Sequence, residues 1–181
     1  MSLSACGGND STSGSTSAAG SATATTSTTA GTAATTDAAA SCPTDGNTRA
    51  FAKTRFVADI GLAAGTFHRW IYKPYQAGTF KKGAEGRNTA IVKAVATAAL
   101  DAKLINNAYK NVEANPTLCK SLKGPLGKLK DSVNSMEDGL KSGDLSSIAT
   151  TQALVSSVMG TAQQNGLKIT ETTDPKAAAT N

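Results

Sequence analysis

A long low-complexity segment near the start of the chain limits what this sequence can fold into. Between residues 7 and 41, every residue except Asn9, Asp10 and Asp37 is Ser, Thr, Ala or Gly. A segment without large side chains cannot bury enough apolar surface to offset the entropy of ordering it. We therefore predict that residues 1–48 form a disordered tether.

The other end of the chain has a similar composition. Residues 170–181 read TETTDPKAAATN and contain no large apolar residue, so we expect a disordered tail. Folding is then confined to residues 49–169. This length is sufficient for one hydrophobic core of ordinary domain size.

Within this region, apolar residues recur in alternating steps of three and four, which is the spacing of one helix face. The pattern predicts helices over 49–73, 88–115, 118–140 and 145–166. No segment has the pattern of a strand. The predicted fold class is therefore all-α, an antiparallel up-down four-helix bundle with a long disordered N-terminal tether.

Several residues refine the predicted helices. Asn88 is the expected N-cap of the second helix, and Gly124 with Pro125 predicts a break or kink in the third. Gly61 and Gly65, one turn apart in the first helix, permit close approach by a neighbouring segment. Gly143 and Asp144 supply a helix stop and a new cap. The clearest apolar stripe belongs to the second helix: Ile91, Val95, Ala98, Ala102, Ile105, Tyr109 and Val112.

The first of three cysteines stands in an informative context. Leu3, Ser4, Ala5 and Cys6 are followed by two glycines and the predicted tether. This resembles the lipobox of bacterial lipoproteins, in which an aliphatic and two small residues precede an invariant cysteine. The resemblance implies a lipid on Cys6 that anchors the protein to the cell membrane, outside the cytoplasm. Because the charged and apolar regions of a signal peptide do not precede Cys6, we expect that the start has been trimmed.

The anchor implied by this resemblance places the other two cysteines in an oxidising compartment. Cys42 and Cys119 are then expected to form a disulfide, and two buried reduced thiols are the alternative. Each lies beside a predicted helix start rather than within an apolar stripe, which favours the disulfide. In an up-down bundle the first and third helices begin at the same end, which brings the two cysteines together.

The charge of the predicted domain is strongly basic. Residues 49–171 contain 17 Lys or Arg and 9 Asp or Glu, whereas residues 1–48 contain three acids and no base. This balance favours anionic partners such as anionic lipid or cell-wall polymer, although basic surfaces are also common for solvation alone. Nucleic acid is not an expected partner, because the charge fits but an extracytoplasmic location does not.

The sequence contains no recognisable catalytic, metal or cofactor site. His68 is the only histidine, and Asp59 lies on the opposite side of the same predicted helix. Periodicity places no partner for a nucleophilic triad or a zinc site beside His68. We therefore predict no enzyme and no cofactor. The alternative is an envelope hydrolase or transferase that uses His68 with carboxylates not identifiable from the sequence.

Aromatic and basic residues concentrate in one region, where five of the eight aromatic residues lie between Phe67 and Phe80. Rings flanked by cations suit sugars, anionic headgroups or protein partners, and the alternative is that they pack the end of the bundle. For a binding face, we expect Tyr75 and Phe80 to be more exposed than Phe67. The predicted binding residues are Lys73, Tyr75, Phe80, Lys81, Lys82 and Arg87.

These features together favour a binding or interaction module displayed at the cell envelope, with a basic, aromatic surface. The tether, the anchor and the basic helical domain are all consistent with display. The composition of the domain, rich in Ala, Thr and Gly, resembles that of uncharacterised envelope proteins of high-GC Gram-positive bacteria.

Overall fold

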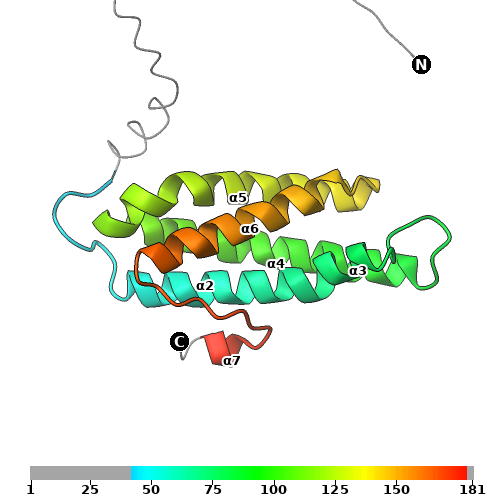
Figure 1. The fold of residues 1–181 in the computed structure, drawn as a ribbon, viewed down its shortest axis with the longest axis horizontal. Helices are drawn as coiled ribbons and strands as arrows, with labels where there is room; N and C mark the ends of the chain where they lie inside the picture. Colours follow the sequence, from blue (N-terminus) through cyan, green and yellow to red (C-terminus); the bar gives the residue numbers. More distant parts are fainter. Residues whose placement is uncertain (1–41, 179–181) are drawn as a thin grey trace, which may run out of the picture. The chain divides into compact units, whose positions relative to one another are not determined.

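The computed structural model describes residues 42–178, in which every regular element is helical (Figure 1). The long helices are α2 (Ala52–Phe67), α4 (Arg87–Glu113), α5 (Pro116–Ser142) and α6 (Ser146–Gln164). The short ones are η1 (His68–Tyr72), α3 (Lys73–Gln76) and α7 (Pro175–Ala178). The all-α class and the helical bundle are confirmed. Cys6 and residues 1–41 of the predicted tether lie outside the described residues.

Successive long helices pack against one another, α2 on α4, α4 on α5 and α5 on α6. In Figure 1 they lie along the long axis, and the chain runs in opposite directions in successive helices. One core fills the space between them, and its largest buried side chains include Phe56, Phe67, Ile105, Leu122, Leu126 and Met136. None of the helices between residues 42 and 178 has an apolar run long enough to cross a membrane.

The first helix continues further than predicted. α2, η1 and α3 follow one another without interruption from Ala52 to Gln76, past the expected end near Lys73. η1 is a π-helical turn, in which the Lys73 N–H donates to the His68 carbonyl five residues earlier. Pro74 cannot donate a backbone hydrogen bond, and its ring would clash with the Trp70 carbonyl in a regular α-helix. The wider turn directly before Pro74 accommodates the proline.

Two details of α4 and α5 differ from the predictions. α4 begins at Arg87, after Gly86 in a left-handed conformation (φ 70°), so Asn88 lies inside the helix and is not its N-cap. α5 runs unbroken through Gly124 and Pro125, so the predicted break is wrong. The apolar side chains on either side of the proline are fully buried, and tertiary packing therefore outweighs the local sequence.

The turn between α5 and α6 confirms one of the two predicted signals. Gly143 ends α5 with φ 87°, a left-handed conformation that glycine adopts without strain, so the predicted stop is confirmed. The N-cap of α6 is Leu145 rather than Asp144, so the predicted cap is one residue too early. The Asp144 carboxylate accepts a hydrogen bond from the Ser146 N–H at 2.9 Å, and bonds to Ser146 hold the pKa of Asp144 below its usual value.

Cys42 and Cys119 form the predicted disulfide, with a Cα–Cα distance of 5.7 Å. The segment that follows Cys42 lies against the turn between α4 and α5, where the Thr48 N–H donates to the Ala114 carbonyl at 2.9 Å. Residues 42–48 were assigned to the tether from composition, but they belong to the folded domain. The disulfide and this backbone hydrogen bond fix them there.

The C-terminal segment is also ordered, contrary to the prediction for residues 170–178; residues 179–181 lie outside the described part. We call residues 167–174 the strap. The Thr172 N–H donates to the Gly61 carbonyl at 3.0 Å, and a Cβ atom on Gly61 would lie 2.6 Å from the Thr170 carbonyl oxygen. A Cβ atom on Gly65 would collide with Thr172. The predicted close approach at the two glycines is confirmed. Backbone contacts at these glycines and the side chains of Leu167 and Ile169, which pack against the core, hold the strap.

Candidate functional site

The predicted binding residues do not form one exposed surface. Phe80 is 3% exposed and Phe67 is 2% exposed, so Phe80 belongs to the core and the prediction for it is wrong. Tyr75 is half-buried against the core and more exposed than Phe67. The loop after α3 folds back in successive turns, and Arg87 Nε donates to the Phe80 carbonyl at 2.9 Å, which closes it. The exposed members of the set are Lys73, Lys81 and Lys82.

A different hollow, of about 590 Å³, opens between the π-helical turn and the strap. We call it the strap hollow. π-Helical turns occur frequently at functional sites, because the widened turn redirects side chains and backbone groups. The residues that line the strap hollow are Gly65, His68, Arg69, Tyr72, Lys73, Gln76, Glu171, Thr172 and Thr173.

His68 is held on both ring nitrogens at the edge of this hollow. Its Nδ1 lies 2.6 Å from Glu171 Oε2, and its Nε2 lies 2.5 Å from Gln152 Oε1. An ionised carboxylate can only accept, so Nδ1 donates to Glu171. The imidazole therefore joins the first helix to the strap and to α6, and its orientation is fixed.

Arg69 and Lys73 give the strap hollow a positive edge. Both side chains are exposed and lie one helical turn apart, and neither forms an ion pair with a carboxylate of residues 42–178. The Arg69 guanidinium lies 5.1 Å from the centroid of the Trp70 ring. The carboxylate among the lining residues, that of Glu171, already pairs with His68. Two cations therefore stand at the hollow without a neutralising partner.

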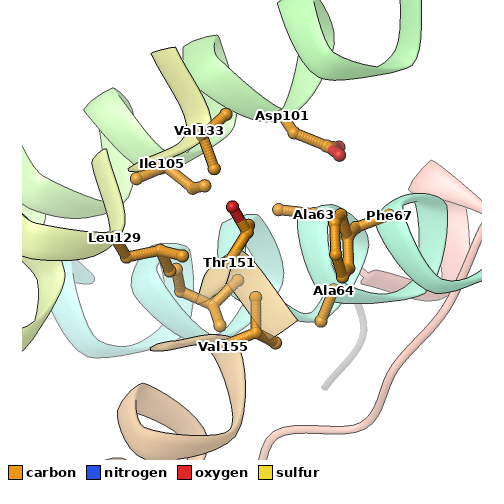
Figure 2. A pocket seen from close by; sticks show the side chains of 10 residues that line it. Ala63, Ala64, Phe67, Asp101, Ile105, Leu129, Val133, Thr151 and Val155 are labelled. Atoms are coloured by element: carbon orange, nitrogen blue, oxygen red, sulfur yellow. The ribbon is translucent and has the colours of Figure 1, made fainter. Parts of the chain in front are cut away.

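A second feature lies inside the bundle. Figure 2 shows a cavity of about 10 Å³ between the four long helices, lined by apolar side chains except for Asp101 and Thr151. Its volume is close to that of a single water molecule, so it cannot admit a substrate. The apolar lining consists of Ile60, Ala63, Ala64, Phe67, Ile105, Leu129, Val133 and Val155.

Asp101 is a buried carboxyl group at this cavity, and its side chain is 1% exposed. Its Oδ1 lies 2.6 Å from Thr66 Oγ1, and its Oδ2 has no hydrogen-bond partner among the described residues. Burial raises the pKa of Asp101 well above its usual 3.8, and the Thr66 contact offsets part of this rise. Thr66 Oγ1 also lies 2.7 Å from the Leu62 carbonyl. Because a hydroxyl has one hydrogen, a neutral Asp101 that donates to Thr66 satisfies both contacts.

Asp59, in the middle of α2, belongs to a separate hydrogen-bond network that connects this helix with α4. It accepts a hydrogen bond from Asn111 Nδ2 at 3.2 Å, and Asn111 Oδ1 accepts one from Arg49 at 3.1 Å. Burial raises the pKa of Asp59 to about 6, and Asn111, Arg49 and Arg55 oppose the rise. These contacts fasten the segment before α2 to α4, and they do not include His68.

Sequence reasoning missed the partners of His68 and the buried acid. Glu171 was assigned to a disordered tail, and no periodic signal connects Gln152 with His68. For Asp101 a signal was present, because it falls in a series with steps of four and three. A charged residue within this series indicates a buried acid. The series is Ala94, Ala98, Asp101, Ile105 and Ala108, all buried.

The described residues contain no group of three or more His, Cys, Asp or Glu side chains that could hold a metal ion. A comparison of the chain with protein-family models, with curated proteins and with solved structures found no match.

Proposed function

We propose that this protein is a binding or interaction module displayed at the cell envelope on a four-helix up-down bundle. A lipid on Cys6 anchors it outside the cytoplasm, and the segment rich in Ser, Thr, Ala and Gly serves as a tether. The lipobox resemblance and the composition of residues 7–41 support this location. The Cys42–Cys119 disulfide also supports it, since disulfides persist in oxidising compartments.

In this proposal the strap hollow is the ligand site, and the ligand carries phosphate or carboxylate groups, as anionic lipids and cell-wall polymers do. The observation that carries the proposal is the pair of exposed cations Arg69 and Lys73 at the hollow, which form no ion pair with a carboxylate of residues 42–178. Arginine presents planar donors that match such groups, and lysine adds a point charge. The aromatic ring of Tyr72 and the imidazole of His68, whose orientation is fixed, form part of the wall of the hollow beside these two cations.

Poly(glycerol phosphate) is a suitable probe for the strap hollow, because it repeats one phosphate per unit and is soluble. In an NMR titration of the full chain, we expect backbone amides of residues 68–76 and 171–173 to shift. Replacing both cations, Arg69→Ala and Lys73→Ala, should weaken binding about tenfold or more. Raising the salt concentration should weaken it as well.

A matched control removes two exposed lysines from α5, Lys120→Ala and Lys128→Ala, and should change the affinity about twofold at most. Equal losses in the two double variants would reduce the binding to nonspecific charge and refute the strap hollow as the site. Shifts confined to other parts of the domain would have the same meaning.

A hydrolase or transferase is the second candidate, and one observation favours it. The Glu171 carboxylate orients the His68 ring in the way that an acid orients a general base. A reacting group would have to displace Gln152 from Nε2. If this candidate is right, His68→Ala should abolish the hydrolysis of a phosphodiester or ester probe, and Gln152→Ala should leave or raise the activity.

A further inference from the structure

The exposed large apolar side chains of the described residues gather along one helix. Val92 is 69% exposed, Leu100 is 43% exposed and Trp70 is 37% exposed. The fourth such residue is Phe51, which stands alone before α2. Val92 and Leu100 belong to α4, and a cation–π contact joins Trp70 to the same helix, with Lys93 Nζ 5.6 Å from the ring centroid.

From residue 89 to residue 110 the exposed residues of α4 recur every three or four residues, with one adjacent pair at 92 and 93, so they lie on a single face of the helix. This face contains three lysines and no acid. The acids of α4 are Asp101, which is buried in the core, and Glu113, which pairs with Lys123. We call this surface the α4 outer face: Thr89, Val92, Lys93, Ala96, Leu100, Lys103, Asn107 and Lys110, with Trp70 beside it.

Close to Trp70 the surface is hollowed. A shallow depression of about 430 Å³ is lined by Trp70, Pro74 and Ala90 together with Lys93 and the turn before α4. The tryptophan thus presents part of its ring on a surface that is otherwise apolar or cationic. Tryptophan favours this kind of boundary, where one part of the indole is in an apolar medium and the other is in contact with water.

We propose that the α4 outer face rests on an anionic membrane surface. Val92, Leu100 and Trp70 would enter the headgroup region, and the three lysines would extend their aliphatic stems along the surface and bring their ammonium groups to lipid phosphates. The charge complementarity selects this partner, because the charged residues of the face are all lysines and the face carries no acid for a basic partner. The surface adjoins the strap hollow where Arg69 lies over Trp70, but the α4 outer face and the strap hollow share no lining residue, and the inference does not rest on the proposed function.

α5 provides the internal comparison. It has the same length as α4, but none of its large apolar side chains is exposed, and its exposed residues include Asp131 and Asp138 as well as lysines. Membrane contact requires exposed lysines together with exposed apolar side chains and no exposed acids. α4 has this combination, whereas α5 has exposed lysines but no exposed large apolar side chain. This difference supplies matched control variants.

The test uses Trp70, the only tryptophan of the chain, as an intrinsic fluorescent probe. The full-length, unlipidated chain is mixed with vesicles of phosphatidylglycerol and phosphatidylcholine, and with vesicles of phosphatidylcholine alone. We expect the emission of Trp70 to shift to shorter wavelength with the anionic vesicles only. Lipids brominated in the upper acyl chain should quench it, because the ring then lies at the level of the headgroups.

Two double variants locate the contact. Lys103→Ala with Lys110→Ala should weaken partitioning about 30-fold, since each lysine at an anionic surface contributes about 1 kcal/mol, or about fivefold. Val92→Ser with Leu100→Ser should weaken it about tenfold or more through lost apolar contact. Both pairs leave the immediate surroundings of the tryptophan intact. The matched control, Lys120→Ala with Lys128→Ala in α5, should change partitioning less than threefold.

Three results would overturn the inference. One is vesicle binding without any change in Trp70 emission, and another is an equal loss in the α5 control, which would indicate nonspecific charge. The third is self-association in sedimentation velocity that the Val92→Ser and Leu100→Ser variant abolishes, together with no vesicle binding. In that case the α4 outer face would be a contact between copies of this chain.

Discussion

α4 and α5 are adjacent helices of 27 residues each, yet they use their apolar side chains in opposite ways. α5 buries seven large apolar side chains in one stripe: Leu118, Leu122, Leu126, Leu129, Val133, Met136 and Leu140. The buried face of α4 contains only two large ones, Ile105 and Val112. The rest of that face is small or polar: Ala94, Ala98, Asp101, Ala108 and Asn111.

α5 therefore places its large apolar side chains in the core, whereas α4 places only some of them there and keeps others at the surface. Alanines on the inner face of α4 permit close approach to its neighbours, since the distance between helix axes depends on the side chains at the contact. Val92 and Leu100 lie away from this inner face and remain exposed. The exposed apolar side chains of α4 therefore contribute little to the core and are available to contact another surface.

The largest expected effect concerns how the two helices are anchored. The disulfide closes a loop of 77 residues that contains α2 and α4 but only the first turn of α5. Replacing Cys42 and Cys119 by Ser should lower the free energy of unfolding by about 4–5 kcal/mol in urea denaturation, through the entropy of the unfolded chain.

Hydrogen exchange on this double variant should sharpen the comparison. Protection should fall more in α4 than in the second half of α5, because the leucine stripe holds α5 in place independently of the disulfide. A loss below about 1 kcal/mol would show that the backbone contacts around Thr48 fasten the segment without the disulfide. Wild-type protein measured with and without reductant provides the control.

The same truncation in the two helices should differ by several kcal/mol. Leu126→Ala in α5 removes a fully buried side chain and should destabilise the domain by about 2–5 kcal/mol. Leu100→Ala in α4 removes a side chain that is 43% exposed and should cost about 1 kcal/mol or less. Thermal or urea unfolding of the two variants measures this, and similar losses would break the comparison.

This contrast also explains what the sequence could and could not predict. The apolar stripe of α5 can be read from the sequence because its apolar residues occupy one face and the other face is polar. α4 has apolar residues around much of its circumference, so the stripe predicted for it, although the clearest in the sequence, coincides only partly with the buried face. Of the residues in the predicted stripe, Ile91, Val95, Ala102 and Tyr109 are only partly buried, and Asp101 occupies the centre of the buried face.

The candidate site was predictable only in part, for a related reason. The sequence pointed to the region around Phe67 to Phe80, and the strap hollow does begin there, with Lys73 at its edge. Its other wall is the strap, whose binding to Gly61 depends on backbone atoms and on the absence of a Cβ atom. Backbone contacts of this kind leave no signal in the sequence of the strap, and the two apolar residues of the strap that pack on the core, Leu167 and Ile169, form too short a run to predict a structure. Phe80 is buried by the fold of a loop, which periodicity does not describe.

Replacing Asp101 by a side chain that cannot ionise tests the protonation state of the buried acid of α4. Because burial raises the pKa of Asp101 well above 3.8, the folded state holds a proton that the unfolded state has lost over a range of pH above about 4. Stability should therefore fall as pH rises from about 4 towards the folded-state pKa, by about 1.4 kcal/mol per pH unit. In Asp101→Asn this dependence is absent, so the stability of the variant relative to the wild type should increase as pH rises.

Urea denaturation of both proteins between pH 6.5 and pH 8.5 measures the difference. Asp59, whose pKa is raised to about 6, is present in both proteins and contributes equally to the two slopes, so the difference between them reports Asp101. Parallel pH dependences in the two proteins would show that Asp101 is ionised in the folded state. α4 would then hold a buried charge rather than a neutral acid.

The smallest expected effect probes whether α5 is helical through Pro125 only because its leucines are buried. Pro125→Ala restores a donor for the Ser121 carbonyl and removes a ring that opposes helical geometry, which favours the folded state. It also gives the unfolded chain more freedom, which offsets part of the gain. We expect a net increase of about 1 kcal/mol in the free energy of unfolding, measured with urea. Lys128→Ala, an exposed change one turn further along α5, should stay within about 0.5 kcal/mol of the wild type. A lower stability of Pro125→Ala would mean that the proline itself contributes to the packing of α5, and the leucine stripe would then not be sufficient to explain why this helix forms against its local sequence.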